Sequence, residues 1–396
     1  MNSKQKALQL VSKGIKASET DIDTATALFL QAWAHDKSDY DVLTAVAASL
    51  ADLGQYETAM TVLQEALQSQ GESDIICSLI GKIAINMQMY DIAEKTLSRS
   101  IELNPNNTDG IADLITALSA QNKFAEAEAF IQAALDVFHD SANLYNALGN
   151  ISLAKSGDRF AAIEAYKKAT ELDPKDSKYI HNLAIAYYLD EEAQSCYEQA
   201  ITLAPADPQI HLSYAIYLFQ KGKIGEGWKH YEHRNHPDLG YNKSAKYTHD
   251  LPNWDGGDPT GKKLLITSEQ GIGDEVFFAA ALPKLYECAE QLFIGCEPRL
   301  QSIIKRSFPK AIVDSHSDQR NYSVRFRSYP EIERNLKDNT YSIDAACLAA
   351  TALSYQCQSA DDYKALRGGY LKPDPTLVEK YSVVIRKDGK KKNIAV

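Results

Sequence analysis

Small and large apolar residues recur at a fixed spacing through the first half of the chain. Ala59, Ala93 and Ala127 follow one another at intervals of 34 residues. Each is followed four positions later by a large apolar residue, namely Leu63, Leu97 and Ile131. Residues four apart lie on the same face of a helix, so the pattern predicts amphipathic helices in a repeating unit. A small residue where two helices cross lets their backbones approach closely.

The same frame extends to seven repeats over residues 6–241. They begin near Lys6, Tyr40, Asp74, Thr108, Ala142, Ser177 and Pro208. Each repeat is interpreted as two antiparallel helices, which gives fourteen helices. The period and its small-residue positions resemble the tetratricopeptide repeat, and the resemblance implies an α-solenoid over residues 1–241. It also implies a protein or peptide partner, held in a groove that the first helix of each repeat lines.

Several polar or aromatic residues of the first helices are candidates for that groove. They are Asp113, Asn146, Asn150, Asn182 and Tyr214. The related arrays of O-linked N-acetylglucosamine transferases present a ladder of asparagines that grips peptide backbone. At the sixth position of the seven repeats only Asn182 is an asparagine, so no such ladder is predicted. The identity of the ligand stays open.

The second half of the chain changes in character. Glycine and proline concentrate after the last repeat, which predicts a connector over residues 242–261. The apolar run 262–268 is interpreted as a buried strand, followed by a glycine turn and by a helix from Val276 to about Cys288. Further strands are predicted at 292–296 and 311–314. Strand, glycine turn and helix are typical of a doubly wound α/β domain, so residues 262–386 are predicted to be Rossmann-like.

Gly271 and Gly273 in this turn admit two interpretations. Their missing side chains could let a sugar or phosphate approach the backbone, or they could serve only a tight turn between strand and helix. Val276 stands where the full G-x-G-x-x-G pattern requires its third glycine, which counts against a dinucleotide site.

Several linked segments carry a resemblance that covers nearly the whole chain. They are residues 252–256 (PNWDG), 263–266 (KLLI) and 269–274 (EQGIGD), with 227–234 (GWKHYEHR) before them and 369–374 (GYLKPD) after them. In this order they resemble bacterial tetratricopeptide glycosyltransferases, whose C-terminal half is similar to the heptosyltransferase (GT-B) fold. The resemblance implies that residues 262–386 are the acceptor-side domain of an inverting transferase.

The resemblance also implies roles for individual residues. Asp274 would be the general base that takes the proton of the attacking hydroxyl, and Glu269, Gln270, Gly271 and Gly273 would contact a glycan acceptor. The alternative for Asp274 is a cap on the helix that follows, a position that aspartate favours.

A nucleotide sugar is the donor that this resemblance implies, and it would bind mainly to a second Rossmann-like domain. Residues 387–396 resemble the start of that domain, so the chain is expected to lack the donor-binding half and to be inactive alone. The other hypothesis is a noncatalytic tetratricopeptide scaffold for protein–protein interaction. No cofactor is expected in this chain.

Charge and composition narrow the partners further. Residues 1–240 carry 19 Lys and Arg against 33 Asp and Glu, whereas the remainder carries 23 against 20. The acidic first half argues against a nucleic-acid partner, because phosphate binding needs clustered cations. The six cysteines form no C-x-x-C pair and the histidines no H-E-x-x-H, so no metal site is predicted. No apolar run is long enough to span a membrane or to resemble a signal peptide, which predicts a cytoplasmic protein.

Overall fold

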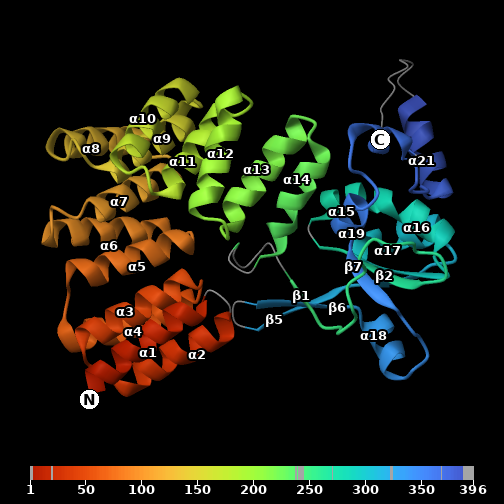
Figure 1. Ribbon diagram of the computed structural model, residues 1–396, viewed down its shortest axis with the longest axis horizontal. Coiled ribbons are helices and arrows are strands. Elements are labelled where there is room, and N and C mark those ends of the chain that lie inside the picture. Colours follow the sequence, from red (N-terminus) through yellow and green to blue (C-terminus); the bar gives the residue numbers. More distant parts are fainter. Residues whose placement is uncertain are drawn as a thin grey trace. The chain divides into compact units, whose positions relative to one another are not determined.

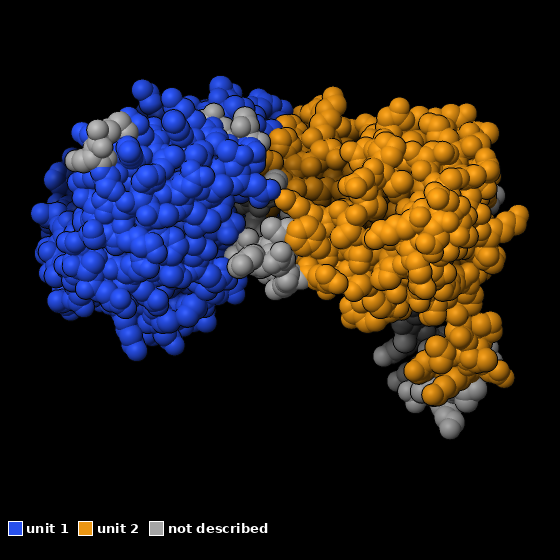
Figure 2. Space-filling view, turned by 90° about the horizontal axis from the view of Figure 1, so that it is seen from below, with its two compact units in different colours: residues 1–217 blue, residues 218–396 orange. Residues whose placement is uncertain are grey.

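The computed structural model describes residues 3–386, except 19–20, 237–238, 240–244, 270, 322–323 and 367. The chain forms two compact units, residues 1–217 (unit 1) and 218–396 (unit 2), which Figure 2 shows in different colours. Gln270 and the predicted domain start at 387–396 lie outside the described residues.

The repeats form the predicted helical solenoid (Figure 1). Fourteen helices are found among the described residues up to Tyr231, as the sequence predicts. They are α1 (Ser3–Ser18), α2 (Ile22–His35), α3 (Tyr40–Asp52), α4 (Tyr56–Gln70), α5 (Asp74–Asn86), α6 (Tyr90–Leu103), α7 (Thr108–Ala120), α8 (Phe124–Val137), α9 (Ala142–Ser156), α10 (Arg159–Leu172), α11 (Ser177–Tyr187), α12 (Glu191–Leu203), α13 (Pro208–Gln220) and α14 (Ile224–Tyr231).

The positions of the 34-residue frame form the core of the solenoid. Ala59, Ala93 and Ala127 are all fully buried, and so are the apolar residues four positions after them. The need for a small residue is clearest at Gly149, where a Cβ atom would lie 2.5 Å from the ring of Tyr166 in the second helix of the repeat. At such a crossing a larger side chain would push the two helices apart.

Successive repeats stack through their first helices. Helices α1 and α3, α3 and α5, α5 and α7, and α7 and α9 are in contact with one another. Polar side chains cap the starts of several of these helices, as Ser73 does for α5 and Asn107 for α7. Helix α11 is joined to α9 by a hydrogen bond between the side chains of Asn182 and Asn146. We call the outward side of the first helices α5, α7, α9 and α11 the first-helix face.

The last helix of the repeats, α14, belongs to unit 2. Trp228 of α14 is part of the main apolar core of unit 2, and its indole nitrogen donates a hydrogen bond to the carbonyl of Cys357 at 2.8 Å. The chain therefore divides between Tyr217 and Leu218, inside α13, whereas the sequence places the end of the repeat array at residue 241. The large aromatic surface of α14 explains the difference, because it is buried against the helices of unit 2.

Unit 2 is built on a small parallel sheet of four strands in the order β4-β3-β2-β7 (Figure 1). Its strands are β2 (Lys263–Thr267), β3 (Gln291–Cys296), β4 (Ile312–Ser315) and β7 (Ala345–Leu348). The central strands are apolar on both faces, which is typical of a parallel sheet covered by helices on each side. Successive strands β3 and β4 lie on one side of β2 and β7 lies on the other, so the strand order reverses at β2.

The helix predicted from Val276 to about Cys288 is found, but with an earlier start and an interruption. Helix α15 (Ile272–Phe278) begins four residues before Val276, because the backbone of the glycine turn is already helical. A 3-10 turn, Ala279–Ala281, joins it to α16 (Leu282–Cys288). The other helices are α17 (Gln301–Ser307), α18 (Pro330–Lys337), α19 (Ala349–Ser354), α20 (Ala360–Ala365) and α21 (Pro375–Arg386).

A second sheet of three strands was not predicted. Strands β5 (Ser317–Asn321) and β6 (Val324–Ser328) pair antiparallel after β4, and β1 (Lys246–Tyr247) pairs parallel to β6. The strand β1 lies within the predicted connector. The sequence SDQRN of β5 has no apolar alternation, so nothing in the local pattern indicates a strand there.

Candidate functional site

Two amide side chains meet on the first-helix face of unit 1. The side-chain nitrogen of Asn182 in α11 donates a hydrogen bond to the side-chain oxygen of Asn146 in α9 at 2.7 Å. An asparagine side chain offers two donor hydrogens and an acceptor oxygen, so this single bond leaves both amides with further hydrogen-bonding capacity. Two of the residues predicted for partner binding are thus brought together from adjacent repeats.

Asp113 of α7 lies half-buried on the same face. Burial raises the pKa of its carboxyl group to about 6, and Asp109 on the same helix raises it as well. Lys82 of α5 and Lys178 of α11 act in the opposite direction. These electrostatic neighbours come from the repeats on both sides of Asp113, which places the carboxylate near the middle of the face.

The other two predicted groove residues, Asn150 and Tyr214, contact side chains of the second helices. Asn150 accepts a hydrogen bond from the hydroxyl of Tyr166 at 2.7 Å, within its own repeat. Tyr214 is only 5% exposed, and its ring stacks on that of Tyr197 with 5.2 Å between the centroids. It therefore lies in the interior between helices. It follows the sixth position of its repeat by one residue, a rotation of about 100° around the helix axis, which explains its inward direction.

In unit 2, two buried charged side chains meet where β2 ends. Glu269 follows β2 and is 3% exposed. Its carboxylate accepts hydrogen bonds from the guanidinium of Arg234. It also accepts one from the backbone nitrogen of Ala350 at 2.8 Å. Arg234 is 1% exposed, lies in the 3-10 helix Glu232–Asn235 after α14, and also donates to the hydroxyl of Thr351 at 2.7 Å.

This buried ion pair occupies the place where the strand order reverses. In open parallel sheets packed with helices, ligands commonly bind outside the carboxyl ends of the strands at such a point. Here Glu269 comes from the end of β2 and Ala350 from the helix after β7, so the Arg234–Glu269 pair joins the two strand ends. The oxygens of Glu269 are thereby engaged by groups of the chain itself.

The glycine turn next to Glu269 has an ordinary backbone conformation. Gly271 has φ of −74°, and neither Gly271 nor Gly273 lies in the left-handed region. Among the described residues, a Cβ atom added at Gly273 would meet no atom within 4 Å, and one at Gly271 would meet only the Asp274 carboxylate at 3.6 Å. Neither the backbone conformation nor the packing of this part of the chain therefore requires either glycine.

Asp274 is exposed and is the third residue of α15. The N-cap position of this helix belongs to Gly271, and no described side chain caps it. Asp274 thus does not occupy the position that the capping alternative requires. Its carboxylate lies close to the backbone of Gly271, since a Cβ atom added there would be 3.6 Å from it.

Glu275, which the sequence pattern did not single out, is the buried carboxyl group of this turn. It is 5% exposed, and its two oxygens accept the backbone N–H of Glu297, at the end of β3, at 2.9 and 3.2 Å. Burial raises the pKa of Glu275 to about 7, although the Glu297 N–H and Arg327 favour its charged form. A carboxyl group with such a pKa can exchange a proton near neutral pH. The sequence Gly-Asp-Glu does not reveal which of its two carboxylates becomes buried.

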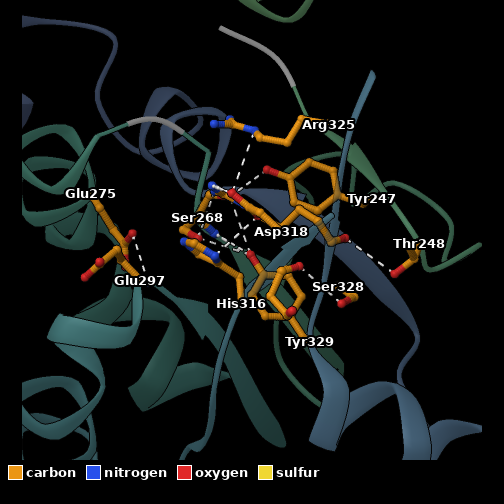
Figure 3. Close-up of polar contacts among 12 residues, drawn as sticks. Tyr247, Thr248, Ser268, Glu275, Glu297, His316, Asp318, Arg325, Ser328 and Tyr329 are labelled. Carbon is orange, nitrogen blue, oxygen red and sulfur yellow. Dashed lines mark hydrogen bonds and ion pairs between the residues drawn. The ribbon is translucent and has the colours of Figure 1, made fainter. Parts of the chain in front are cut away.

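Beyond the end of β4, a polar cluster surrounds Asp318 (Figure 3). The guanidinium of Arg327 donates two hydrogen bonds to the Asp318 carboxylate, at 2.9 and 3.1 Å, and a third to the carbonyl of Ser268 at 3.1 Å. Nδ1 of His316 lies 3.4 Å from the same carboxylate. Burial, followed by the charge of Arg327, lowers the pKa of His316. The hydroxyl of Tyr329, the residue after β6, accepts a hydrogen bond from the N–H of Ser268 at 3.1 Å. This bond holds the end of β6 next to the end of β2.

Two kinds of functional feature, a metal site and a membrane-spanning helix, are not found among the described residues. Within the described ranges, no group of three or more His, Cys, Asp or Glu side chains is arranged to hold a metal ion. In the same part of the chain, none of the helices combines the length and the apolarity needed to cross a membrane.

Comparison with known proteins supports the assignment of unit 1. The chain matches the tetratricopeptide repeat family over residues 84–151 and again over residues 142–176. Together with the fourteen helices in near-constant register, these matches define the class: the chain is a tetratricopeptide repeat protein with a helical solenoid.

The chain is also similar to individual proteins. It is 30% identical to Protein FlbA of Caulobacter vibrioides over 345 residues, which cover 85% of this chain and 56% of FlbA. It is 23% identical to Protein O-mannosyl-transferase Tmtc3 of Drosophila melanogaster over 164 residues, 40% of this chain and 18% of Tmtc3. The crystal structure of yeast Tom70 superposes with a TM-score of 0.49 at 21% identity, covering 58% of this chain and 50% of Tom70.

The extent of these matches has two consequences. The chain spans little more than half the length of FlbA and less of Tmtc3. The match to FlbA is longer than the whole solenoid, so it extends into unit 2.

Proposed function

We propose that the first-helix face of unit 1 binds an extended peptide segment of a partner protein. The observation that carries this proposal is the Asn146–Asn182 pair, which presents amide donors and acceptors from two adjacent repeats. An extended peptide exposes N–H and C=O groups that need such partners when they leave water. Tetratricopeptide arrays typically use the surface of their stacked repeats for this purpose.

Replacing both Asn146 and Asn182 with alanine is expected to weaken peptide binding roughly 30-fold, because each of the two amides contributes about 1 kcal/mol. The probe is a dodecapeptide selected from a random displayed library on the whole chain, and affinity is measured by fluorescence anisotropy. Asn106→Ala is the matched control, because Asn106 is exposed in the turn before α7. If the library yields no peptide, or if the double variant binds as tightly as the unaltered chain, the proposal is wrong.

We further propose that unit 2 is the acceptor-binding side of a glycosyltransferase-like protein. The supporting observation is the pair Gly271 and Gly273. Neither the backbone conformation of the turn nor its packing against described residues requires a glycine at these two positions. A ligand lying against the backbone would account for both, and a glycan hydroxyl there would lie beside the exposed carboxylate of Asp274. Asp274 would then be the general base, and a nucleotide sugar the donor used by the whole protein. The alternative remains a noncatalytic scaffold in which unit 2 is structural.

Gly273→Ala separates these two possibilities. The substitution puts a methyl group where a glycan would contact the backbone, and it is expected to remove glycan binding while stabilising α15 by about 0.5–1 kcal/mol. Saturation-transfer NMR with glucose, galactose and N-acetylglucosamine measures the binding. Gly368→Ala is the control, because a Cβ atom added at Gly368 also meets no described atom within 4 Å. Absence of any saccharide signal from the unaltered chain, or equal signals from Gly273→Ala, would favour the scaffold.

A further inference from the structure

The carboxylate of Asp113 is partly withdrawn from water on the first-helix face without a counter-ion beside it. Within the part of the chain that the structure describes, no hydrogen bond or ion pair within 4.0 Å engages it. Its neighbour Asp109 differs, because Asp109 is exposed and accepts a hydrogen bond from the amide of Asn143 at 2.6 Å. The surface around Asp113 therefore contains an acid that could accept a partner from outside the chain.

The charged groups that face Asp113 come from three helices. Asp109 lies on its own helix α7, Lys82 on α5 and Lys178 on α11, while the intervening α9 contributes neutral amides. Both lysines are exposed, and the ammonium of Lys82 lies 3.8 Å from the carboxylate of Asp52 in the preceding repeat. The two lysines thus act on the Asp113 carboxylate only from a distance.

Leaving a carboxylate half-buried without a cation is unfavourable for its charged form. The pKa of Asp113, raised from 3.8 to about 6, corresponds to a roughly 100-fold change in its protonation equilibrium. A bound cation that excluded the remaining water would remove this penalty. The surplus of 33 acidic over 19 basic residues in the first 240 would attract such a ligand from a distance.

We propose that Asp113 receives the side chain of a single lysine or arginine in the peptide that the first-helix face binds. This inference rests on the proposed peptide-binding function of that face, and it further specifies that the bound peptide carries a basic residue. The guanidinium of an arginine matches a carboxylate with two parallel hydrogen bonds, and a lysine supplies a point charge. Lys82 and Lys178 on either side repel further cations, so the segment next to the basic residue is neutral or acidic.

The test is a selection of random dodecapeptides on the whole chain, followed by affinity measurements with the selected peptide. We expect one basic residue at a fixed position of the selected peptides. Replacing that residue with norleucine or citrulline is expected to weaken binding roughly 10- to 100-fold at pH 7.5, and Asp113→Asn should do the same. The two changes together should cost little more than either alone, because they remove the same interaction.

Titration gives a second readout. For a peptide without His, Asp or Glu, affinity should fall roughly 10-fold between pH 7.5 and pH 5, where about a tenth of a carboxylate with a pKa near 6 is ionised. Asp113→Asn should abolish this pH dependence. Asp109→Asn is the matched control, since it removes the same charge one turn away, and it should keep the pH dependence. Circular dichroism confirms that each variant is folded.

Two results would overturn the inference and leave the peptide-binding function standing. One is a selected peptide without a basic residue that binds Asp113→Asn as tightly as the unaltered chain. The other is an acidic peptide whose binding depends on Lys82 and Lys178. A library that yields no peptide whose binding depends on Asn146 and Asn182 would overturn the inference and the proposed function together.

Discussion

Glu269→Ala is expected to destabilise unit 2 by about 3–5 kcal/mol, because it leaves the guanidinium of Arg234 buried without its counter-ion. Arg234 is 1% exposed, so water cannot replace the lost carboxylate. The guanidinium keeps two neutral partners, the hydroxyl of Thr351 and the carbonyl of Tyr231. The carboxylate of Glu232, 3.2 Å away, is half-exposed and therefore compensates the buried charge only weakly. The same substitution removes the acceptor of the Ala350 N–H, which holds the end of β7 against the end of β2.

The effect can be measured by urea unfolding followed by tryptophan fluorescence. The three tryptophans are Trp33 in unit 1 and Trp228 and Trp254 in unit 2, so a Trp33→Phe background reports on unit 2 alone. Asp361→Ala is the matched control, because its ion pair with Lys364 is exposed and should contribute less than about 1 kcal/mol.

A double variant distinguishes a buried charge from a simple loss of packing. Replacing Arg234 with methionine and Glu269 with leucine removes both charges, and it should cost less than Glu269→Ala alone. A Glu269→Ala variant that loses less than about 1 kcal/mol, with the midpoint of unfolding near that of the Asp361→Ala control, would show that the pair does not support the sheet.

Unit 2 is also expected to lose stability as pH rises, because of Glu275. Its pKa is about 7 in the folded chain and near 4.5 when it is exposed to water. A carboxyl group whose folded pKa is raised binds its proton more tightly in the folded state, so folding is favoured at low pH. The contribution to the free energy of unfolding decreases from about pH 4.5 to about pH 7, by up to about 3 kcal/mol.

Glu275→Gln isolates this contribution. The glutamine keeps a carbonyl oxygen for the Glu297 N–H but carries no charge, so the variant should be more stable than the unaltered chain at pH 8 and similar to it near pH 4.5. Urea unfolding in the Trp33→Phe background at pH 4.5, 6 and 8 gives the difference directly. Asp274→Asn, which changes the exposed neighbouring carboxylate, should not reproduce it. A difference between Glu275→Gln and the unaltered chain that is constant over this range would contradict the assignment.

The buried carboxylates of Glu269 and Glu275 differ in what they can contribute to chemistry in unit 2. Glu269 is fixed by a cation, so its charge serves the fold at the point where the strand order reverses. Glu275 is buried beside the glycine turn, and among the described residues no cation contacts it directly, which leaves it able to change its protonation state near neutral pH. If unit 2 binds a glycan hydroxyl at Asp274, Glu275 is the adjacent group through which pH would act on that turn.

Local patterns in the sequence determined most of the secondary structure. The spacing of Ala59, Ala93 and Ala127 indicated helix crossings, and all three are buried where helices meet. The apolar runs of β2, β3 and β4 were predicted close to their observed bounds. Such patterns can be recognised in a sequence because the periodicity of a helix or strand alone decides which of its residues share a face. The same reasoning placed Asn146 and Asn182 on one face, since they occupy adjacent positions of the repeat in the first helices.

Only the tertiary structure decided which polar residues have partners. Arg234 and Glu269 are 35 positions apart, Trp228 and Cys357 are 129 apart, and no local pattern specifies either contact. The start of α15, the burial of Glu275 and the hairpin of β5 and β6 likewise depend on neighbours from distant segments. Burial and charge pairing are properties of an assembled core. The sequence therefore determined the elements and their faces, and packing determined which polar groups on them are already satisfied.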